Sequence, residues 1–369
     1  MGIDTPGNPS ELDPSVKRER NFLFEGASSM MAKRKKAGEL SFSQDTVLAD
    51  DANGLYAVAD GVGGYSGGDL ASDLAIKTVQ EVVARGRKPE MSREDREVLL
   101  KEAMEEAERR IITERAASAI DKNMSTTFCG ILVGQTSGGG PEVTMGWAGD
   151  TRGYRYRAAT GELIRLTRDD RPLELLNDYI GGVLTSETIR AIEQSEQQGR
   201  DVQLPAVQTM IEAIDGAFER LRAEPNVPEW VEETLRSLQV GITNTDIHGF
   251  NLAEHLFATR QAITRYLGSS RGAHVQSFEA DAGDIFFTVS DGVSDVLTEE
   301  RMTAIIKSGL AKGWDLLNIL TSLEDQATVD LSKRQKGRPV ERDMQDNPTL
   351  YSGDDLGLAG VVIKSAETK

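Results

Sequence analysis

The stretch from Gly54 to Ala71 places the strongest constraint on the fold, because a short apolar run in it ends abruptly on a carboxylate and glycines. Residues 55–59, Leu-Tyr-Ala-Val-Ala, have the length and composition of a buried strand, and Asp60-Gly61 follows at once. A strand that delivers one carboxylate into a glycine-rich loop suits a cation or phosphate site. The simpler interpretation is a strand followed by a tight turn, since Asp-Gly is a common turn dipeptide. The remainder of the chain must decide between the two.

The composition is that of a globular chain with room for a sizeable core. Hydrophobic residues make up 38% and charged residues 28% of the 369 positions, a balance at which wholesale disorder is not expected. The length suits one large domain or two ordinary ones. No apolar run approaches the roughly 20 residues that a membrane-spanning helix needs, and the first residues lack the apolar core of a secretory signal.

Charge and cysteine content limit the expected partners and location. A net charge of −18 argues against a general nucleic-acid or membrane-surface partner, because such binding depends on neutralising phosphates. The one cysteine, Cys129, excludes an internal disulfide and fits a reducing compartment. It lies in an apolar run, where a cysteine usually serves as a small core residue. We therefore expect a cytoplasmic protein with no nucleic-acid or membrane partner, and the sequence carries no indication of its oligomeric state.

Alternating apolar patterns and turn residues divide the chain into an antiparallel meander with helices inserted. Residues 1–20 are expected to form a flexible tail. Residues 171 to about 260 have the pattern of a helical insertion or lid, so we predict one domain over residues 21–369 that this block interrupts. The polar face of the helix predicted at 92–118 is expected to be solvated. Strands are expected at residues 22–27, 40–48, 55–59, 126–134, 143–149, 154–157, 162–166, 275–280, 284–290 and 356–364, and helices at 70–85, 92–118, 189–197, 207–222, 228–238 and 314–323.

Aspartates stand at the ends of several predicted strands. Asp60, Asp150, Asp291 and the pair Asp354-Asp355 each adjoin an apolar run, and Asp45 lies in or beside another. A single aspartate in such a place is usually a turn former or a cap. If the strand ends meet in space, however, repelling carboxylates would come together, and bound divalent cations are the usual remedy. Oxygen ligands without cysteine or clustered histidine suit Mg²⁺ or Mn²⁺ rather than zinc, and the three scattered histidines are expected to be structural.

Six segments of the sequence, in their order along the chain, carry a resemblance to a known family. They are Gln44-Asp45, Val58–Gly64 (VADGVGG), Ser125-Thr126-Thr127, Gly149-Asp150-Thr151-Arg152, Ser290–Asp295 (SDGVSD) and Asp354-Asp355. Together they resemble the signature motifs of the metal-dependent serine/threonine phosphatases, the protein phosphatase 2C family. The likeness covers roughly residues 22–168 and 261–364 and leaves the insertion unmatched. One such motif would be weak support, whereas six in order are specific.

The resemblance implies an α+β fold, a four-layer sandwich of two antiparallel β-sheets flanked by helices, with a binuclear metal site at one end. By similarity, Asp60 would bridge two divalent cations, Mg²⁺ or Mn²⁺, and the carbonyl of Gly61 would bind one of them. Asp45 would lie close to the ions and contact them directly or through water. The resemblance thus assigns Asp60 and Asp45 to catalysis. A hydroxide bridging the two ions would then attack the phosphate in line.

The same resemblance assigns the remaining acids. Asp291 and Asp354 would hold the second ion. Asp355 is the neighbouring candidate, but Asp354 is favoured because the following Leu-Gly-Leu resembles a family variant in which the second acid replaces an asparagine. Asp150 and Asp295 match positions that in this family bind a third, weaker ion.

Two positions depart from the family pattern. Many members carry an arginine for the substrate phosphate where this chain has Leu40, so the phosphate-binding group is unknown; Lys35, Lys36 and Arg152 are candidate substitutes. Some members place a histidine, a candidate general acid, where this chain has Val62. These departures concern substrate handling more than metal binding.

The expected function is metal-dependent hydrolysis of phosphate monoesters on serine or threonine of phosphorylated protein substrates. The alternative is a catalytically weak relative that binds or senses phosphoproteins, suggested by Leu40 and the long insertion. The enzyme is favoured because every expected metal carboxylate is present.

Overall fold

The structure, a computed structural model, describes residues 23–31, 43–62, 67–88, 90–118, 124–171, 263–336 and 355–364, with five single positions between 212 and 236. The expectations for the N-terminal tail, the basic residues 33–36, Leu40 and Asp354 lie outside these residues. The same holds for the helical insertion, of which Glu212, Asp215, Gly216, Glu219 and Arg236 alone are described, each in helical conformation.

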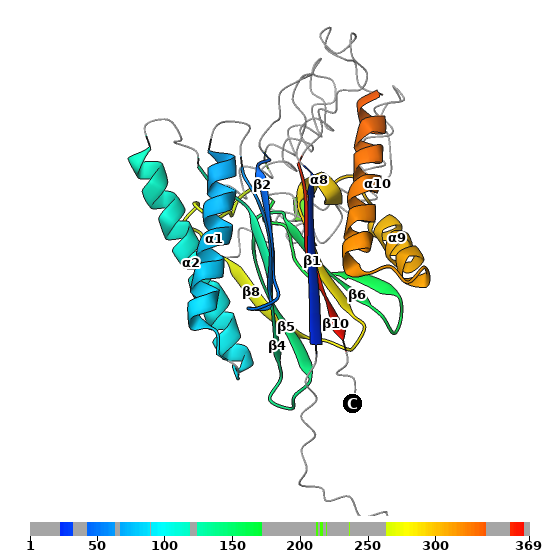
Figure 1. Cartoon of the computed structure of the whole chain (residues 1–369). Coiled ribbons are helices and arrows are strands. Elements are labelled where there is room, and N and C mark those ends of the chain that lie inside the picture. The colour runs from blue at the N-terminus through cyan, green and yellow to red at the C-terminus, as the bar shows by residue number, and fades with distance from the viewer. Residues whose placement is uncertain are drawn as a thin grey trace, which may run out of the picture.

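Two antiparallel five-stranded sheets form the centre of the molecule (Figure 1). The first has the strand order β1-β10-β9-β6-β7 and the second β2-β3-β4-β5-β8. The first sheet contains β1 (Leu23–Met31), β10 (Leu356–Lys364), β9 (Ile285–Val289), β6 (Arg152–Arg157) and β7 (Glu162–Arg165). The second contains β2 (Asp45–Asp50), β3 (Leu55–Asp60), β4 (Phe128–Gln135), β5 (Pro141–Ala148) and β8 (His274–Glu279).

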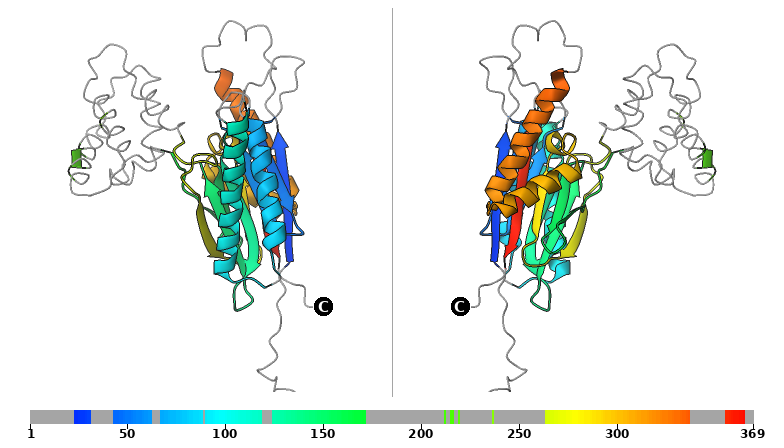
Figure 2. Two further views of the ribbon diagram at one scale, coloured as in Figure 1. Left: turned by 90° about the vertical axis from the view of Figure 1, so that its left-hand side faces the viewer. Right: turned by 90° about the vertical axis from the view of Figure 1, so that its right-hand side faces the viewer.

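Helices cover the outer face of each sheet (Figures 1 and 2). The second sheet is covered by α1 (Gly68–Gly86) and α2 (Arg93–Ala117). The first is covered by α8 (Asp291–Ser294), α9 (Glu299–Ala311) and α10 (Leu316–Lys336). The order is therefore helices, sheet, sheet, helices, and the predicted four-layer sandwich is confirmed.

The central strands are buried on both faces, which explains why they appear in the sequence as continuous apolar runs. In β3, Leu55, Ala57 and Ala59 pack toward α1 and α2, whereas Tyr56 and Val58 pack between the two sheets. Successive side chains of a strand point to opposite faces, so each run supplies two separate cores.

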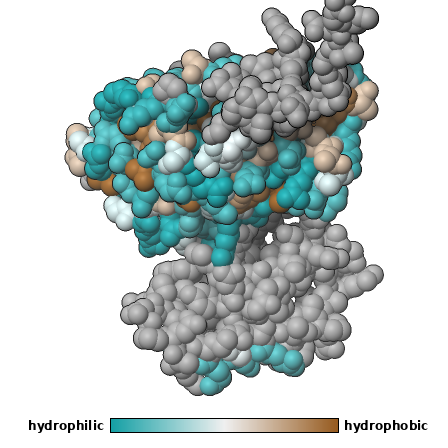
Figure 3. Space-filling view, turned by 90° about the horizontal axis from the view of Figure 1, so that it is seen from below, coloured by the Kyte–Doolittle hydropathy of each residue, from teal (hydrophilic) through white to brown (hydrophobic). Residues whose placement is uncertain are grey.

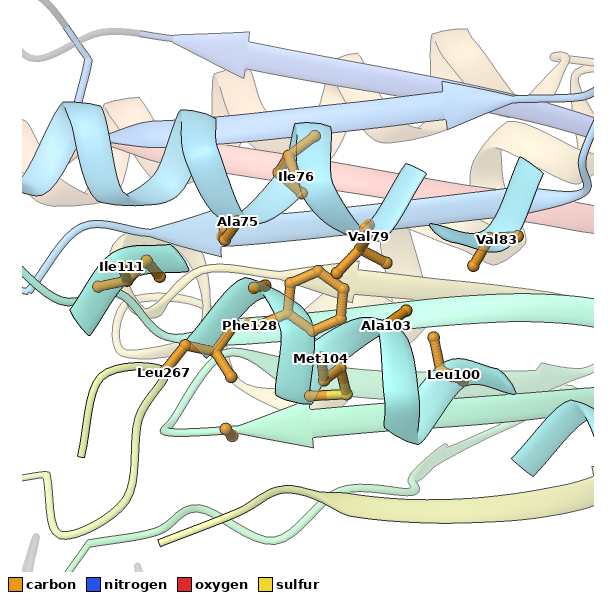
Figure 4. Close-up of a cluster of buried hydrophobic side chains, with 14 of the residues drawn as sticks. Ala75, Ile76, Val79, Val83, Leu100, Ala103, Met104, Ile111, Phe128 and Leu267 are labelled. Carbon is orange, nitrogen blue, oxygen red and sulfur yellow. The ribbon is translucent and has the colours of Figure 1, made fainter. Parts of the chain in front are cut away.

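The core beneath α1 and α2 is drawn in Figure 4, where side chains from both helices enclose the ring of Phe128 from β4. Helix α2 begins with a capping box, in which the side chain of Ser92 accepts from the backbone N–H of Asp95 and the Asp95 side chain accepts from that of Ser92. The polar face expected to be wholly solvated is not, because Arg96 and Glu108 are buried. That expectation was wrong, since Arg96 contacts Glu142 of β5 and Glu108 accepts from the backbone N–H groups of Gly268 and Ser270, at 3.3 and 2.7 Å.

The strand ends that carry acidic residues meet at one end of the sandwich, the upper end in Figure 1, where α8 lies. Val289 of β9 pairs with Leu358 of β10 on one side and with Arg152 of β6 on the other. In the second sheet, Asp45 pairs with Asp60. The opposite end, seen in Figure 3, shows mainly hydrophilic residues with scattered apolar ones where the described residues form the surface. No described helix is both long and apolar enough to cross a bilayer.

Candidate metal centre

Asp45 and Asp60 are direct cross-strand neighbours at the acidic end of the second sheet. Asp45 is the first residue of β2 and is buried, whereas Asp60 is the last residue of β3 and is partly exposed. Side chains at directly opposite positions lie within about 5 Å at their Cβ atoms, so two carboxylates here repel each other unless a cation lies nearby. The structure thus brings together the two residues assigned to catalysis.

A ring of backbone and hydroxyl hydrogen bonds fixes Asp60. Its carbonyl oxygen accepts from the N–H of Thr127 at 2.8 Å and from the hydroxyl of Thr126 at 2.7 Å. Its own N–H donates to Oγ1 of Thr127 at 3.1 Å, and that hydroxyl lies 2.6 Å from Oγ1 of Thr151. The threonines of two sequence motifs therefore hold the backbone that presents the carboxylate.

Glycine is required directly after Asp60. A Cβ at Gly61 would overlap the backbone of Gly68, the first residue of α1, so only glycine allows that helix to approach the strand end. The N–H of Gly61 donates to the carbonyl of Gln44 at 3.0 Å. This bond ties the turn to the segment that leads into β2.

Asp355 reaches the same place from the first sheet. It is buried, and its Oδ2 accepts from the N–H of Gln44 at 2.7 Å, one residue before Asp45. Two residues further, a Cβ at Gly357 would stand 2.9 Å from Oδ2 of Asp45. The missing side chain leaves space beside that carboxylate, and a bond from Gly357 N–H to Oγ of Ser290 at 2.9 Å joins β10 to the start of α8.

Asp291 and Asp295 lie on the short helix α8 that follows β9. Asp291 is its first residue and Asp295 caps its end, with the N–H of Asp295 donating to the carbonyl of Asp291 at 2.8 Å. Residues four apart on a helix lie on one face, so both carboxylates point to the same side. Their side chains are about a quarter exposed, at 25% and 24%.

Asp150 is fully buried beside an arginine that the sequence did not single out. Its Oδ2 accepts from Nε of Arg171 at 2.8 Å and lies 2.5 Å from Nη2 of the same side chain. Burial raises the pKa of Asp150, and the guanidinium of Arg171 opposes that rise. Arg171 also lies within 4 Å of Asp295 and Asp291. No motif pointed to Arg171, because a lone arginine at the start of a polar insertion has no distinguishing pattern.

Arg152, a candidate for binding the substrate phosphate, is engaged elsewhere. Its guanidinium makes a paired contact with Asp169, through Nε at 3.0 Å from Oδ1 and Nη2 at 2.7 Å from Oδ2. Its Nη1 donates to the carbonyl of Ser294 at 3.2 Å. Burial alone would lower the pKa of Arg152, but Asp169 holds it well above its ordinary value. These bonds suit a structural tie between β6 and α8.

His274 has structural contacts, as expected. Its Nε2 lies 3.0 Å from Oδ1 of the buried Asp170, and its ring stacks on Trp147 at 4.9 Å between centroids. Asp170 also accepts from the N–H of Gly149 at 3.0 Å. These contacts fix the residue that precedes Asp150 without bringing the imidazole to the Asp45–Asp60 pair.

The donors around Asp45 and Asp60 fit hard cations in their chemistry, since carboxylate and carbonyl oxygens are the ligands that Mg²⁺ and Mn²⁺ prefer. The space beside Asp45 left by Gly357 agrees with this. Within the described residues, no three His, Cys, Asp or Glu side chains are grouped closely enough to hold a metal ion. Asp354, which belongs to the predicted ligand set, lies outside those residues, so the full set of ligands stays a prediction.

Comparison with solved structures places the fold among bacterial phosphatases. The Mycobacterium tuberculosis serine/threonine phosphatase PstP is 18% identical over 93% of this chain and 99% of its own, with a TM-score of 0.56. The PstP catalytic domain in complex with two manganese ions gives 17% identity over 93% and 100% of the chains and a TM-score of 0.55. The serine/threonine phosphatase Stp1 from Staphylococcus aureus gives 13% identity over 94% and 97%, with a TM-score of 0.57. All three are described as phosphatases, so the alternative of a sensing module gains no support from them.

Sequence comparisons give two further results. A search of curated proteins found no match. The family model described as protein phosphatase 2C matches residues 34–314, more than half of the chain, including the segments that carry Asp45, Asp60, Asp150 and Asp291. The chain therefore belongs to the protein phosphatase 2C family and is a protein phosphatase.

Proposed function

We propose that this protein removes phosphate from serine and threonine residues of phosphoproteins, using two divalent cations, Mg²⁺ or Mn²⁺, held at the acidic end of the sandwich. The observation that carries the proposal is the meeting of Asp45 and Asp60, direct neighbours in one sheet, with Asp355 arriving from the other. Such a concentration of buried and half-buried negative charge is stabilised when cations occupy it.

The residues that would hold the ions are Asp60 and the carbonyl of Gly61, with Asp45, Asp291 and Asp354 around them. When bound, paired divalent cations lower the pKa of a shared water and neutralise charge on the phosphoryl oxygens during an in-line displacement. The chain itself keeps the acids in register through the β2–β3 ladder and through the threonines that bind the Asp60 backbone.

Asp355 has a different task in this proposal. Its Oδ2 binds the N–H of Gln44 and so positions the residue before Asp45. This contact agrees with Asp354, rather than Asp355, as the ligand from this segment. We infer that Asp355 aligns the two sheets at the site.

The test measures hydrolysis of p-nitrophenyl phosphate and of a serine-phosphorylated protein with Mn²⁺ or Mg²⁺, then with excess EDTA. Activity should require the metal and return when it is restored. Asp60→Asn should lower kcat by roughly 100-fold or more, about 3 kcal/mol, while the thermal unfolding profile without metal stays close to that of the wild type. Thr160→Ala, at an exposed turn far from the site, is the matched control and should keep full activity.

Two outcomes would contradict the proposal. One is full activity in EDTA, which would remove the need for cations. The other is a near wild-type rate for Asp60→Asn, which would show that the shared ligand has been assigned to the wrong residue.

A further inference from the structure

Arg171 is a buried cation that lies among the carboxylates assigned by resemblance to a third metal ion. Its side chain is 3% exposed, and it is the last residue of the described range 124–171. Both Nε and Nη2 contact Oδ2 of Asp150, at 2.8 and 2.5 Å. Nη1 lies 3.5 Å from Oδ1 of Asp295, and Nη2 lies 3.7 Å from Oδ2 of Asp291.

The neighbouring arginines mainly neutralise another carboxylate, and of these Arg152 also lies 3.7 Å from Oδ1 of Asp295. Asp169 is contacted by Arg152 in a paired arrangement and by Arg165. Arg171 lies 3.8 Å from Asp169, further than from Asp150. The charge of Arg171 is therefore directed mainly to Asp150, with Asp295 next in distance.

A third divalent cation does not fit between these carboxylates while Arg171 is in place. An Mg²⁺ ion needs oxygen ligands at about 2.0–2.1 Å in a near-octahedral arrangement. The space between Asp150 and Asp295 that such an ion would need is filled by the guanidinium, which approaches both acids. Because an arginine stays charged under all ordinary conditions, its positive charge is permanent.

The geometry points to Arg171 as a positioning residue that takes the place of a third divalent cation in this protein. The inference rests on the proposed function, because Asp291 belongs to the predicted two-ion site. Arg171 holds Asp150 and the two acids of α8 in fixed relation, which an exchangeable, weakly bound ion would do only when present. Orientation of Asp291 then depends on a covalently attached charge rather than on the concentration of free metal.

One atom indicates where an ion would enter if the guanidinium were removed. Oδ1 of Asp150 is buried and has no hydrogen-bond partner among the described residues. With Arg171 shortened to alanine, both oxygens of Asp150 would lack a cation in a buried position, which is a costly arrangement. A divalent ion shared with Asp295 would relieve that cost.

The first experiment counts bound Mn²⁺ per chain by equilibrium dialysis and metal analysis. Arg171→Ala should bind one ion more than the wild type. Arg171→Ala combined with Asp150→Asn should lose the additional ion. Arg265→Ala is the matched control, because it removes a nearby guanidinium that contacts Asp170 instead, and it should bind the wild-type number.

The second experiment measures Tm with EDTA and with increasing Mn²⁺. Arg171→Ala should unfold several degrees below the wild type in EDTA, and Mn²⁺ should recover more of its Tm than it adds to the wild type. Arg171→Lys keeps a positive charge and should show the wild-type ion number and little additional recovery.

The results separate this inference from the proposed function. A wild type that binds three ions, or an Arg171→Ala variant with no additional ion, overturns the role of Arg171. Should Arg171→Ala not fold, the wild-type count and Arg171→Lys still decide the matter. A wild type that binds no Mn²⁺ contradicts the proposed two-ion mechanism, whereas the difference between wild type and Arg171→Ala tests Arg171 alone.

Discussion

At the acidic end of the sandwich, individual residues act through the backbone positions that they occupy. Asp45 and Asp60 face each other because their strands pair in one register, and a slip of one residue would turn one carboxylate to the opposite face. Thr126 and Thr127 bind the main chain at Asp60, so the register is fixed at its last position. These two threonines therefore contribute to the site by holding the backbone of Asp60, and not as metal ligands.

The buried thiol of Cys129 is expected to be unreactive in the folded protein. Burial raises the pKa of its thiol to about 12, so the thiol stays protonated in the folded protein. We expect thiol reagents to leave the folded protein unmodified at pH 8 and to react fully in denaturant, with no loss of phosphatase activity in the first case. Rapid modification of the folded protein would contradict the buried position.

The raised pKa of Cys129 also makes the stability of the folded protein depend on pH. Above the ordinary thiol pKa of about 8.5, the unfolded chain loses a proton that the folded chain keeps, so stability falls as pH rises from there toward 12. Cys129→Ala should show a shallower fall between pH 8 and 10 in urea unfolding. The same slope in both proteins would count against the shift.

Single residues also show what sequence alone could supply. The acids at strand ends were recognisable because each interrupts an apolar run, and the structure brings Asp45, Asp60 and Asp355 together. Arg171 could not be recognised, because its importance comes from contacts with residues more than 20 positions away. Contacts of that kind depend on the folded topology and leave no local pattern.

At the scale of elements, a buried ion pair joins α2 to the sheet beneath it. Arg96 of α2 contacts Glu142 of β5, and their side chains are 2% and 1% exposed. Arg93 contacts the same carboxylate from a side chain that is 44% exposed. One glutamate thus receives one buried and one solvated partner.

The two arginines should differ in their contribution to stability. Arg96→Met removes a buried partner and the donors to the carbonyls of Met91 and Gln135, and should cost about 3–5 kcal/mol in urea unfolding. Arg93→Met should cost about 1 kcal/mol or less, because the Arg93 side chain is largely exposed and the buried carboxylate that it contacts keeps Arg96 as a partner. Equal losses for both variants would show that burial does not govern this pair.

The elements differ in how far their sequences define them. The strand predicted at residues 356–364 has the bounds observed for β10, because an apolar run follows directly on a carboxylate. Helix α9 was not predicted, although Thr298 caps it by accepting from the N–H of Arg301. Helix α10 continues to Lys336 rather than ending at Leu323, because its packing on β1 and β10 extends it through a polar sequence. Packing against another layer supplied the information that periodicity lacked.

At the scale of the whole molecule, the described core is left after residue 171 and resumes at residue 263, at neighbouring points on either side of the predicted insertion. The N–H of Thr264 donates to the carbonyl of Asp170 at 2.7 Å. Leu267 pairs with Thr126, whose hydroxyl binds the carbonyl of Asp60. The insertion is therefore attached beside the acidic end, and its two attachments are held together without it.

This arrangement makes a deletion informative. Replacing residues 175–250 by a short glycine-serine linker should leave hydrolysis of p-nitrophenyl phosphate nearly unchanged and alter the rate on a phosphoprotein about tenfold, or about 1.4 kcal/mol. The small ester needs only the acidic end, whereas a protein substrate also meets whatever surrounds it. Equal losses on both substrates would indicate that the insertion is part of the core.

The antiparallel ladder between β1 and β10 determines how far a label attached beside it would lie from the acidic end. Leu23 pairs with Lys364 at one end and Met31 with Leu356 at the other, next to Asp355. Eight residue steps of about 3.3 Å separate these ends by about 26 Å. A fluorophore or an affinity handle joined next to Leu23 or Lys364 would thus be anchored about 26 Å along the ladder from Asp355, at the end of the sandwich opposite the acidic residues.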